Sequence, residues 1–222
     1  MPLTRLPGGL LVAIEGIDGA GKTSVSTLLA QYCGERGIAC LLSKEPTSLR
    51  WGQELRRSAS TGRLTLDDEL DLFIKDRREH VERVITPALA EGSVVILDRY
   101  YWSNAAYQGG RGADRAQILA RNEAFAPKPD LCLLLDVDAQ SGGERIRRRG
   151  DTPNLFEDPA ALTRARAIFL TLAAQTPTAH TLDASGSLKS VAAAALRVFQ
   201  ETLLQKLPSE GELRERFLTL LV

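Results

Sequence analysis

This chain of 222 residues lacks the long apolar runs that mark membrane proteins and secretory leaders. Only five consecutive apolar residues precede Glu15, and no run approaches the roughly 18 residues needed to cross a bilayer. We therefore expect no signal peptide, no membrane span and no membrane partner. The expected location is the cytoplasm.

Net charge and cysteine are also scarce. The 28 Lys and Arg residues balance 28 Asp and Glu residues, so no overall field attracts a nucleic acid. Cys33, Cys40 and Cys132 are odd in number and lack C-x-x-C spacing, which argues against a disulfide framework or a metal site. We expect these cysteines in the core and any recognition of phosphate to be local.

What the chain does contain is a phosphate-binding loop at residues 16–23, the phosphate loop hereafter. Its sequence Gly-Ile-Asp-Gly-Ala-Gly-Lys-Thr follows an apolar run and precedes a predicted helix. In this context the glycines and the helix N-terminus direct backbone N–H groups at an anion. Lys22 would reach the β- and γ-phosphates of ATP, and Thr23 would bind Mg²⁺. The residues predicted to bind ATP are Gly16, Ile17, Asp18, Gly19, Ala20, Gly21, Lys22 and Thr23.

Predicted strands and helices alternate along the chain. Apolar runs predict strands at residues 10–14, 39–43, 94–97, 131–135 and 178–182, and helical spacing predicts helices at 24–35, 53–57, 66–84 and 191–204. This alternation is typical of one α/β domain, here residues 1–222, with a doubly wound, parallel, five-stranded sheet flanked by helices. Ligands bind beyond the carboxyl ends of such strands. Residues 207–222 predict a further helix with no recognisable chemistry.

Asp98 and Arg99 follow the predicted strand at residues 94–97. At the carboxyl end of a buried strand, Asp98 can order Mg²⁺ or its waters, and Arg99 can hold phosphate oxygens. The alternative is a surface ion pair worth about 0–1 kcal/mol. These residues alone leave both interpretations open.

Arg77 lies on the apolar stripe of the predicted helix at residues 66–84. A guanidinium that faces inward needs an anion, and its planar fork suits a phosphate. Phe73, one turn away, offers a flat face for a base. The alternative is a buried ion pair between Arg77 and a carboxylate such as Asp98. Asp76 is expected on the solvated face.

An arginine-rich segment follows the predicted strand at residues 131–135. Arg145, Arg147, Arg148 and Arg149 lie close together, a pattern that ordinarily marks a solvated helix face. The phosphate loop, however, has no arginine at its variable positions. We therefore expect this mobile segment to supply the cation that stabilises the transferring phosphoryl group.

Taken in order, these motifs resemble the thymidylate kinases, P-loop kinases that transfer the γ-phosphoryl group of ATP to dTMP. The resemblance runs from Leu10 to about Asp183 and includes residues 15–23, 44–46, 73–78, 98–100, 103–109, 129–131, 135–138 and 145–149. It implies ATP and dTMP as substrates, Mg²⁺ as cofactor, dTDP as product and a homodimer. It also implies a bacterial-type lid at about residues 142–157, with Arg145 and Arg149 as the candidate catalytic arginines.

The same resemblance implies roles on the acceptor side. Phe73 would stack on thymine, and Arg77 would hold the base and monophosphate side. Arg99 would clamp the acceptor phosphate, Asn104 would bond to the pyrimidine edge, and Tyr107 would crowd the 2′ position so that deoxyribose is preferred.

The remaining implied roles complete the metal-binding, substrate-binding and catalytic sets. Asp18 would contact the acceptor sugar or a metal-bound water, and Asp98 would join Thr23 at the metal. The substrate set is Asp18, Glu45, Phe73, Arg77, Arg99, Ser103, Asn104, Tyr107 and Gln108. The catalytic set is Asp18, Lys22, Arg99, Arg145 and Arg149.

Three departures from the family pattern bear on the acceptor. Residues 45–48 read Glu-Pro-Thr-Ser, Asn154 and Leu155 replace an acidic and a basic residue, and Trp102 stands where a small or acidic residue is common. Trp102 would reshape the acceptor pocket or pack at a surface or dimer contact. The alternatives are therefore a kinase for another nucleoside monophosphate and a nucleotide-binding regulatory protein with impaired transfer.

Overall fold

The computed structural model describes residues 3–62, 64–148, 158–207 and 209–221. Within this part of the chain the sheet consists of β1 (Leu10–Glu15), β2 (Cys40–Lys44), β3 (Val94–Asp98), β4 (Leu131–Asp136) and β5 (Ala179–Asp183). All neighbouring strands are parallel, in the order β2-β3-β1-β4-β5. Each predicted strand is present to within one residue at either end. The predicted doubly wound sheet is confirmed.

The central strands β1 and β3 are buried along their whole length. Helices cover both faces, so these strands read as continuous apolar runs instead of alternating patterns. In the register of the sheet, Asp98 pairs with both Ile14 and Lys44, so the carboxyl ends of β1, β2 and β3 are level. The residues that follow these strands therefore meet at one edge.

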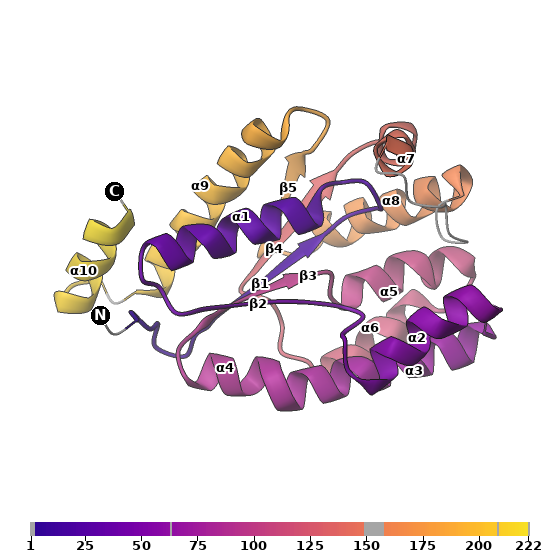
Figure 1. The fold of residues 1–222 in the computed structure, drawn as a ribbon, viewed down its shortest axis with the longest axis horizontal. Helices are drawn as coiled ribbons and strands as arrows, with labels where there is room; N and C mark the ends of the chain where they lie inside the picture. The colour runs from indigo at the N-terminus through magenta and orange to yellow at the C-terminus, as the bar shows by residue number, and fades with distance from the viewer. Residues whose placement is uncertain (1–2, 63, 149–157, 208, 222) are drawn as a thin grey trace.

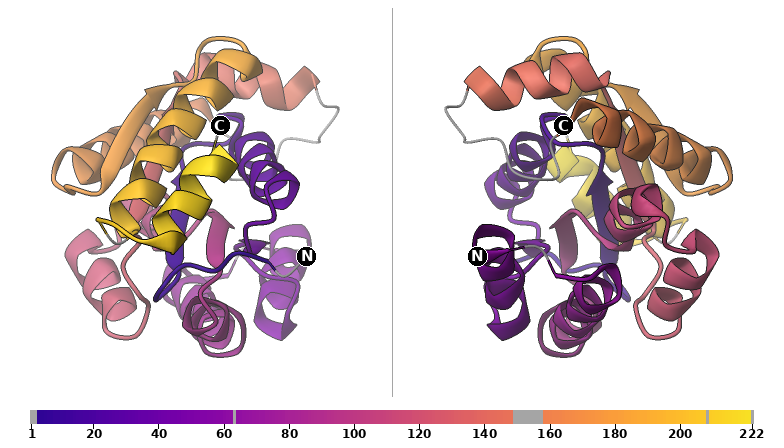
Figure 2. Two further views of the ribbon diagram at one scale, coloured as in Figure 1. Left: turned by 90° about the vertical axis from the view of Figure 1, so that its left-hand side faces the viewer. Right: turned by 90° about the vertical axis from the view of Figure 1, so that its right-hand side faces the viewer.

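The direction of each crossover decides which face a helix covers. The connection from β1 to β2 runs one way across the sheet, and the three later strand connections run the other way. Because parallel crossovers are right-handed, α1 (Lys22–Glu35) covers one face, where α9 (Leu188–Lys206) packs beside it. The opposite face carries α4 (Thr86–Ala90), α5 (Tyr101–Tyr107) and α8 (Pro159–Ala174), as the views in Figure 1 and Figure 2 show.

The helix predicted at residues 66–84 is interrupted and extended. It comprises α3 (Leu66–His80), a π-helical turn η1 (Val81–Ile85) and then α4. Pro87 lies in the first turn of α4, directly after the π-helical turn, and the backbone stays helical from η1 into α4. The proline therefore does not end the helix, and the predicted boundary at residue 84 is wrong.

Other helices are longer than predicted or were not predicted. The helix predicted at residues 53–57 is α2 (Arg50–Thr61), and the arginine-rich segment begins as α7 (Ala139–Arg148). No element was predicted for α5, η2 (Gly109–Arg111), α6 (Arg115–Glu123) or α8. The expected C-terminal helix is present as α10 (Glu212–Leu221), and its Phe217 is buried in the main core.

The cysteines are free thiols, as expected. Cys33 and Cys132 are buried in the core, and Cys40 is half-buried against it. Among the described helices, none combines the length and the apolar character needed to span a bilayer.

Candidate active site

The phosphate loop connects the end of β1 to the first residue of α1. Gly16, Gly19 and Gly21 all have positive φ angles, of 143°, 81° and 97°. A side chain at Gly16 would also place its Cβ 2.5 Å from the carbonyl oxygen of Leu135. Both the backbone path and the close packing therefore require glycine.

Lys22 is buried beneath this loop and folds back on it. Its Nζ donates a hydrogen bond to the Ile17 carbonyl at 2.7 Å, and the side chain is 6% exposed. Burial, and after it the positive charge of Arg99, lowers the pKa of Lys22 to about 8. The ammonium is therefore held at the loop at a cost that an anionic ligand would offset.

Thr23 and Asp98 bring together the two predicted metal-binding side chains. Thr23 Oγ1 donates to Asp98 Oδ2 at 2.5 Å, whereas Asp98 Oδ1 is buried and makes no hydrogen bond within the described structure. A buried carboxylate oxygen without a donor suits a hard cation. The described residues contain no cluster of three or more His, Cys, Asp or Glu side chains that could hold a metal alone. These two residues fit Mg²⁺, which commonly takes its other ligands from phosphates and water.

Asp18 joins the phosphate loop to the ends of β3 and α5. Its Oδ2 accepts from Tyr107 Oη at 2.8 Å, its backbone N–H donates to the same Oη at 3.0 Å, and its Oδ1 accepts from Arg99. Arg99 thus pairs with Asp18, and Asp98 bonds to Thr23. The alternative of an ion pair between Asp98 and Arg99 at the surface is wrong.

Arg99 itself has an unusual backbone. Its φ of 72° makes it the single non-glycine residue with positive φ among those described. That conformation costs about 1–2 kcal/mol for an L-residue. Two hydrogen bonds hold it, from Arg99 N to the Ile14 carbonyl at 3.0 Å and from Tyr100 N to Glu15 Oε1 at 2.9 Å. The structure thus maintains a local strain that directs the guanidinium toward the phosphate loop.

Glu15 is the supporting residue that sequence reasoning missed. It is 1% exposed and also accepts from Ser103 Oγ at 2.6 Å, so it connects β1 to the start of α5. The available signal was an acidic residue directly after a buried apolar strand. Ser103, predicted to bind substrate, instead bonds to Glu15 and lies 3.3 Å from Arg99.

Substitution of Glu15 tests this role through stability. Burial raises the pKa of Glu15 from 4.5 to about 7 against the opposing effects of Ser103 and Arg99. A carboxyl whose folded pKa is raised contributes stability below pH 4.5 that is lost as the pH rises to 7. Urea unfolding should therefore show that Glu15→Gln gains about 3 kcal/mol relative to the unaltered chain between pH 5 and pH 8. An equal difference at both pH values would contradict the raised pKa.

On the acceptor side, Arg77 is buried in a network of hydrogen bonds. Its Nη2 and Nε lie 2.5 and 2.8 Å from Glu45 Oε2, and its Nη1 donates to Asn104 Oδ1 at 2.6 Å and to Asn122 Oδ1 at 2.5 Å. The buried ion pair considered as an alternative is present, with Glu45 in the place of Asp98. Asn104 also donates to Gln108 Oε1 at 3.1 Å. The network joins three of the predicted acceptor residues to Glu45.

The surroundings of this network include a correction. Asp76, expected on the solvated face, is 1% exposed and accepts from the backbone N–H and the hydroxyl of Thr47, at 2.8 and 2.5 Å. Asp76 thus accepts hydrogen bonds from the loop after β2. Thr47 in that loop is distant from Asp76 in the sequence, so the local pattern around Asp76 did not indicate this role. Phe73 lies half-buried one helical turn before Arg77, as its spacing predicts.

The arginine-rich helix α7 begins beside the phosphate loop. A side chain at Gly142 would place its Cβ 2.7 Å from the Asp18 carbonyl oxygen, which shows how closely the two segments pack. Arg145 Nη1 lies 3.5 Å from the Gly19 carbonyl, and its Nη2 donates to the Ser185 carbonyl at 3.1 Å. Arg147 and Arg148 are exposed. Arg149, Asn154 and Leu155 lie outside the described residues.

A cavity of about 320 Å³ lies on the α7 side of the phosphate loop. Residues that line it include Gly21, Arg145, Arg148, Ala184 and Leu188. Backbone N–H groups and arginines at one side and small or apolar side chains at the other suit a nucleotide with its phosphates at the loop.

Trp102 is buried, contrary to the alternative in which it packs at the surface of the chain. It is 7% exposed and lines a separate cavity of about 330 Å³ with Pro129, Cys132 and Pro177. None of the described residues that line this cavity is Phe73, Arg77, Asn104 or Tyr107.

Comparison with known proteins decides the family. The model of the thymidylate kinase family matches residues 14–195, most of the chain. The chain belongs to the thymidylate kinase family. It is 52% identical over 207 residues to the thymidylate kinase of Xanthomonas campestris pv. campestris (strain B100), covering 93% of this chain and 90% of that protein. It is also 47% identical over 206 residues to the thymidylate kinase of Xylella fastidiosa (strain M12), covering 93% and 94%.

Family membership also agrees with the fold. The crystal structure of thymidylate kinase from Ehrlichia chaffeensis superposes with a TM-score of 0.71 at 29% identity, covering 87% of this chain and all of that one. The predicted P-loop kinase fold and the predicted enzyme class, an ATP-dependent nucleoside monophosphate kinase, are confirmed.

Proposed function

We propose that the chain transfers the γ-phosphoryl group of ATP to dTMP, giving dTDP and ADP. The observation that carries this proposal is the meeting of Arg99 and Tyr107 on Asp18 of the phosphate loop. A guanidinium and a tyrosine hydroxyl at the loop proposed to hold the donor phosphates support this role, because they could meet the phosphate and the sugar of the acceptor. The relatives that match nearly the full chain are named thymidylate kinases, which supports the same acceptor.

On the donor side, the phosphate loop and Lys22 hold the ATP phosphates. Thr23 and Asp98 are the residues that would hold Mg²⁺, since they offer a hydroxyl and a buried carboxylate oxygen without a donor. When bound, Mg²⁺ neutralises charge on the β- and γ-phosphates. Arg145, next to the Gly19 carbonyl, adds positive charge where the transferring group passes.

On the acceptor side, Arg99 orients the dTMP phosphate and Asp18 orients Arg99. An oxygen of that phosphate attacks the γ-phosphorus, and the bond from the γ-phosphorus to the bridging oxygen of ADP breaks. The attacking oxygen is already anionic, so positioning and charge stabilisation suffice without a strong base. Tyr107 excludes a 2′-hydroxyl, and Arg77 and Asn104 recognise the pyrimidine with Phe73 against its face.

The expected homodimer and cytoplasmic location belong to this proposal. Glu45, Ser103 and Gln108 also belong to it, as residues that hold other side chains of the site in place. Glu45 does so through Arg77, Ser103 through Glu15, and Gln108 through Asn104.

A panel of acceptors tests the proposal. With MgATP fixed, initial rates are measured with dTMP, dUMP, dCMP, dGMP and ribothymidine monophosphate. We expect dTMP to have the highest kcat/KM, by about 10-fold or more over an acceptor that differs at the base or the 2′ position. A higher kcat/KM with another monophosphate would favour a different acceptor. Binding of ATP without transfer to any acceptor would favour an impaired regulatory homologue.

A further inference from the structure

A chain of buried side chains connects the edge strand β2 to Arg77. Ser43 Oγ lies 2.8 Å from His80 Nε2, and His80 Nδ1 lies 3.0 Å from Glu45 Oε1. The other carboxylate oxygen of Glu45 accepts both Nε and Nη2 of Arg77. His80 and Arg77 are each 1% exposed, and Glu45 is 5% exposed. The imidazole and the guanidinium therefore both bind the same carboxylate, and solvent does not compete with either of them.

The chemistry of these groups fixes the direction of each hydrogen bond. The carboxylate of Glu45 in its pair with Arg77 only accepts, so His80 Nδ1 must carry a proton. The hydroxyl of Ser43 can donate to Nε2 of the neutral ring and can accept from it when the ring is protonated. In either state His80 donates to Glu45.

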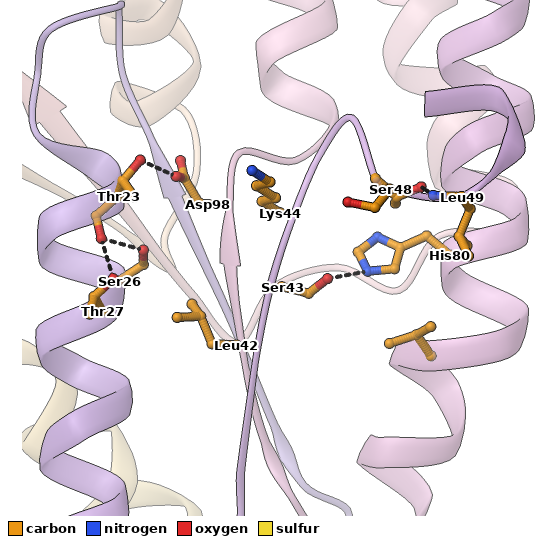
Figure 3. A pocket seen from close by; sticks show the side chains of 12 residues that line it. Thr23, Ser26, Thr27, Leu42, Ser43, Lys44, Ser48, Leu49, His80 and Asp98 are labelled. Carbon is orange, nitrogen blue, oxygen red and sulfur yellow. Dashed lines mark hydrogen bonds between the residues drawn. The ribbon is translucent and has the colours of Figure 1, made fainter. Parts of the chain in front are cut away.

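Figure 3 shows the cavity that His80 and Ser43 line. His80 and Ser43 form one wall of a cavity of about 430 Å³, and Thr23 and Asp98 form the facing wall. The charged groups around the ring are Glu45 from the loop after β2, Asp76 and Arg77 from α3, and Lys44 and Asp98 at the cavity. His80 lines this cavity and Glu45 does not, and the hydrogen bond from His80 Nδ1 is what holds Oε1 of the Glu45 carboxylate on that side.

We propose that His80 is a positioning residue for the acceptor nucleotide, acting through Glu45 on Arg77. With the donor from His80, Glu45 holds Arg77 in the orientation that points Nη1 at Asn104. Without it, a buried carboxylate oxygen loses its partner, and the carboxylate turns and takes the guanidinium with it. This inference rests on the proposed function, in which Arg77 and Asn104 recognise the pyrimidine of dTMP.

Two substitutions of nearly equal size separate the hydrogen bond from the packing. His80→Leu fills the space but removes the donor, and His80→Asn places an amide nitrogen at the same number of bonds from Cα as Nδ1. We expect His80→Leu to raise the KM for dTMP about 10-fold and to lower the preference for dTMP over dCMP by a similar factor. The KM for ATP should change less than about 2-fold. His80→Asn should stay within about 3-fold of the unaltered enzyme on every measure.

Two further variants complete the design. Val84→Ala lies on the wall of the same cavity without bonding to Glu45, so its dTMP kinetics should match those of the unaltered chain. Ser43→Ala removes the outer partner of the ring and should raise the KM for dTMP by a smaller factor, about 3-fold. It provides the test if His80→Leu does not fold.

The outcomes that overturn the inference are distinct. Equal kinetics for His80→Leu and His80→Asn would show that the donor has no role. Parallel increases in the KM for ATP and for dTMP would indicate a purely structural role. An unaltered chain that makes no dTDP would refute the proposed function itself. Transfer to dTMP with an unchanged KM in both His80→Leu and Ser43→Ala would refute only this inference.

Discussion

Replacement of Lys22 by methionine is expected to lower kcat/KM by about a thousand-fold or more while the chain remains folded. Lys22 is buried beneath the phosphate loop, and its Nζ donates a hydrogen bond to the Ile17 carbonyl of that loop. Methionine keeps the length of the side chain and removes the charge that meets the β- and γ-phosphates. The loss should therefore appear with every acceptor.

The same variant has an expected signature in stability. Burial lowers the pKa of Lys22 from 10.5 to about 8, so below pH 8 the folded chain carries a charge that costs free energy, and stability rises as the pH increases from 8 toward 10.5. Lys22→Met should thus melt no lower than the unaltered chain at pH 7, and MgATP should no longer raise its melting temperature. Lys128→Met, which replaces a lysine with a 71% exposed side chain, is the control and should match the unaltered chain. Activity within 10-fold of normal in Lys22→Met would contradict the assignment.

Replacement of Arg145 by alanine is expected to lower kcat by about a thousand-fold, with a much smaller change in the KM for dTMP. The phosphate loop contains no arginine, so we expect an arginine outside the loop to stabilise the negative charge of the transferring phosphoryl group. Arg145 is the arginine that α7 places against the loop, 3.5 Å from the Gly19 carbonyl. Single-turnover rates with saturating MgATP and dTMP measure the effect on the chemical step.

Arg147 provides the matched control for this experiment. It lies on the same helix, two residues away, and its side chain is exposed. Arg147→Ala removes the same charge from α7 and should retain at least about a third of the unaltered rate. Comparable losses in Arg145→Ala and Arg147→Ala would show that α7 acts through its total charge. A loss below 3-fold in Arg145→Ala would remove this arginine from the catalytic set.

The strands and the phosphate loop could be predicted because their signals are local. Continuous apolar runs mark β1, β3 and β4, and the loop carries its glycines, lysine and threonine within eight residues. The helices α5, α6 and α8 gave no comparable signal. Their buried faces include small or polar residues, such as Ala105 in α5, Asn122 in α6 and Ala165 in α8, which weaken the apolar contrast along the sequence.

The contacts of the candidate site that could not be predicted are those between residues distant in sequence. Asp76 reads as a surface residue because its acceptor role depends on Thr47, which precedes it by 29 positions. Asn122 reaches Arg77 from a helix that was not predicted. The inward direction of Arg77 followed from the apolar stripe, but the choice of Glu45 over Asp98 as its partner depends on how the loop after β2 folds.

The most direct test of the account is to follow the phosphoryl group itself. Purified chain is incubated with Mg²⁺, dTMP and ATP labelled at the γ-phosphorus, and the labelled products are separated and identified. The account predicts that the label leaves ATP and appears in the β-phosphate of dTDP in equal amount to the ADP formed. Label that remains in ATP or appears only in inorganic phosphate, with no labelled dTDP, would contradict it.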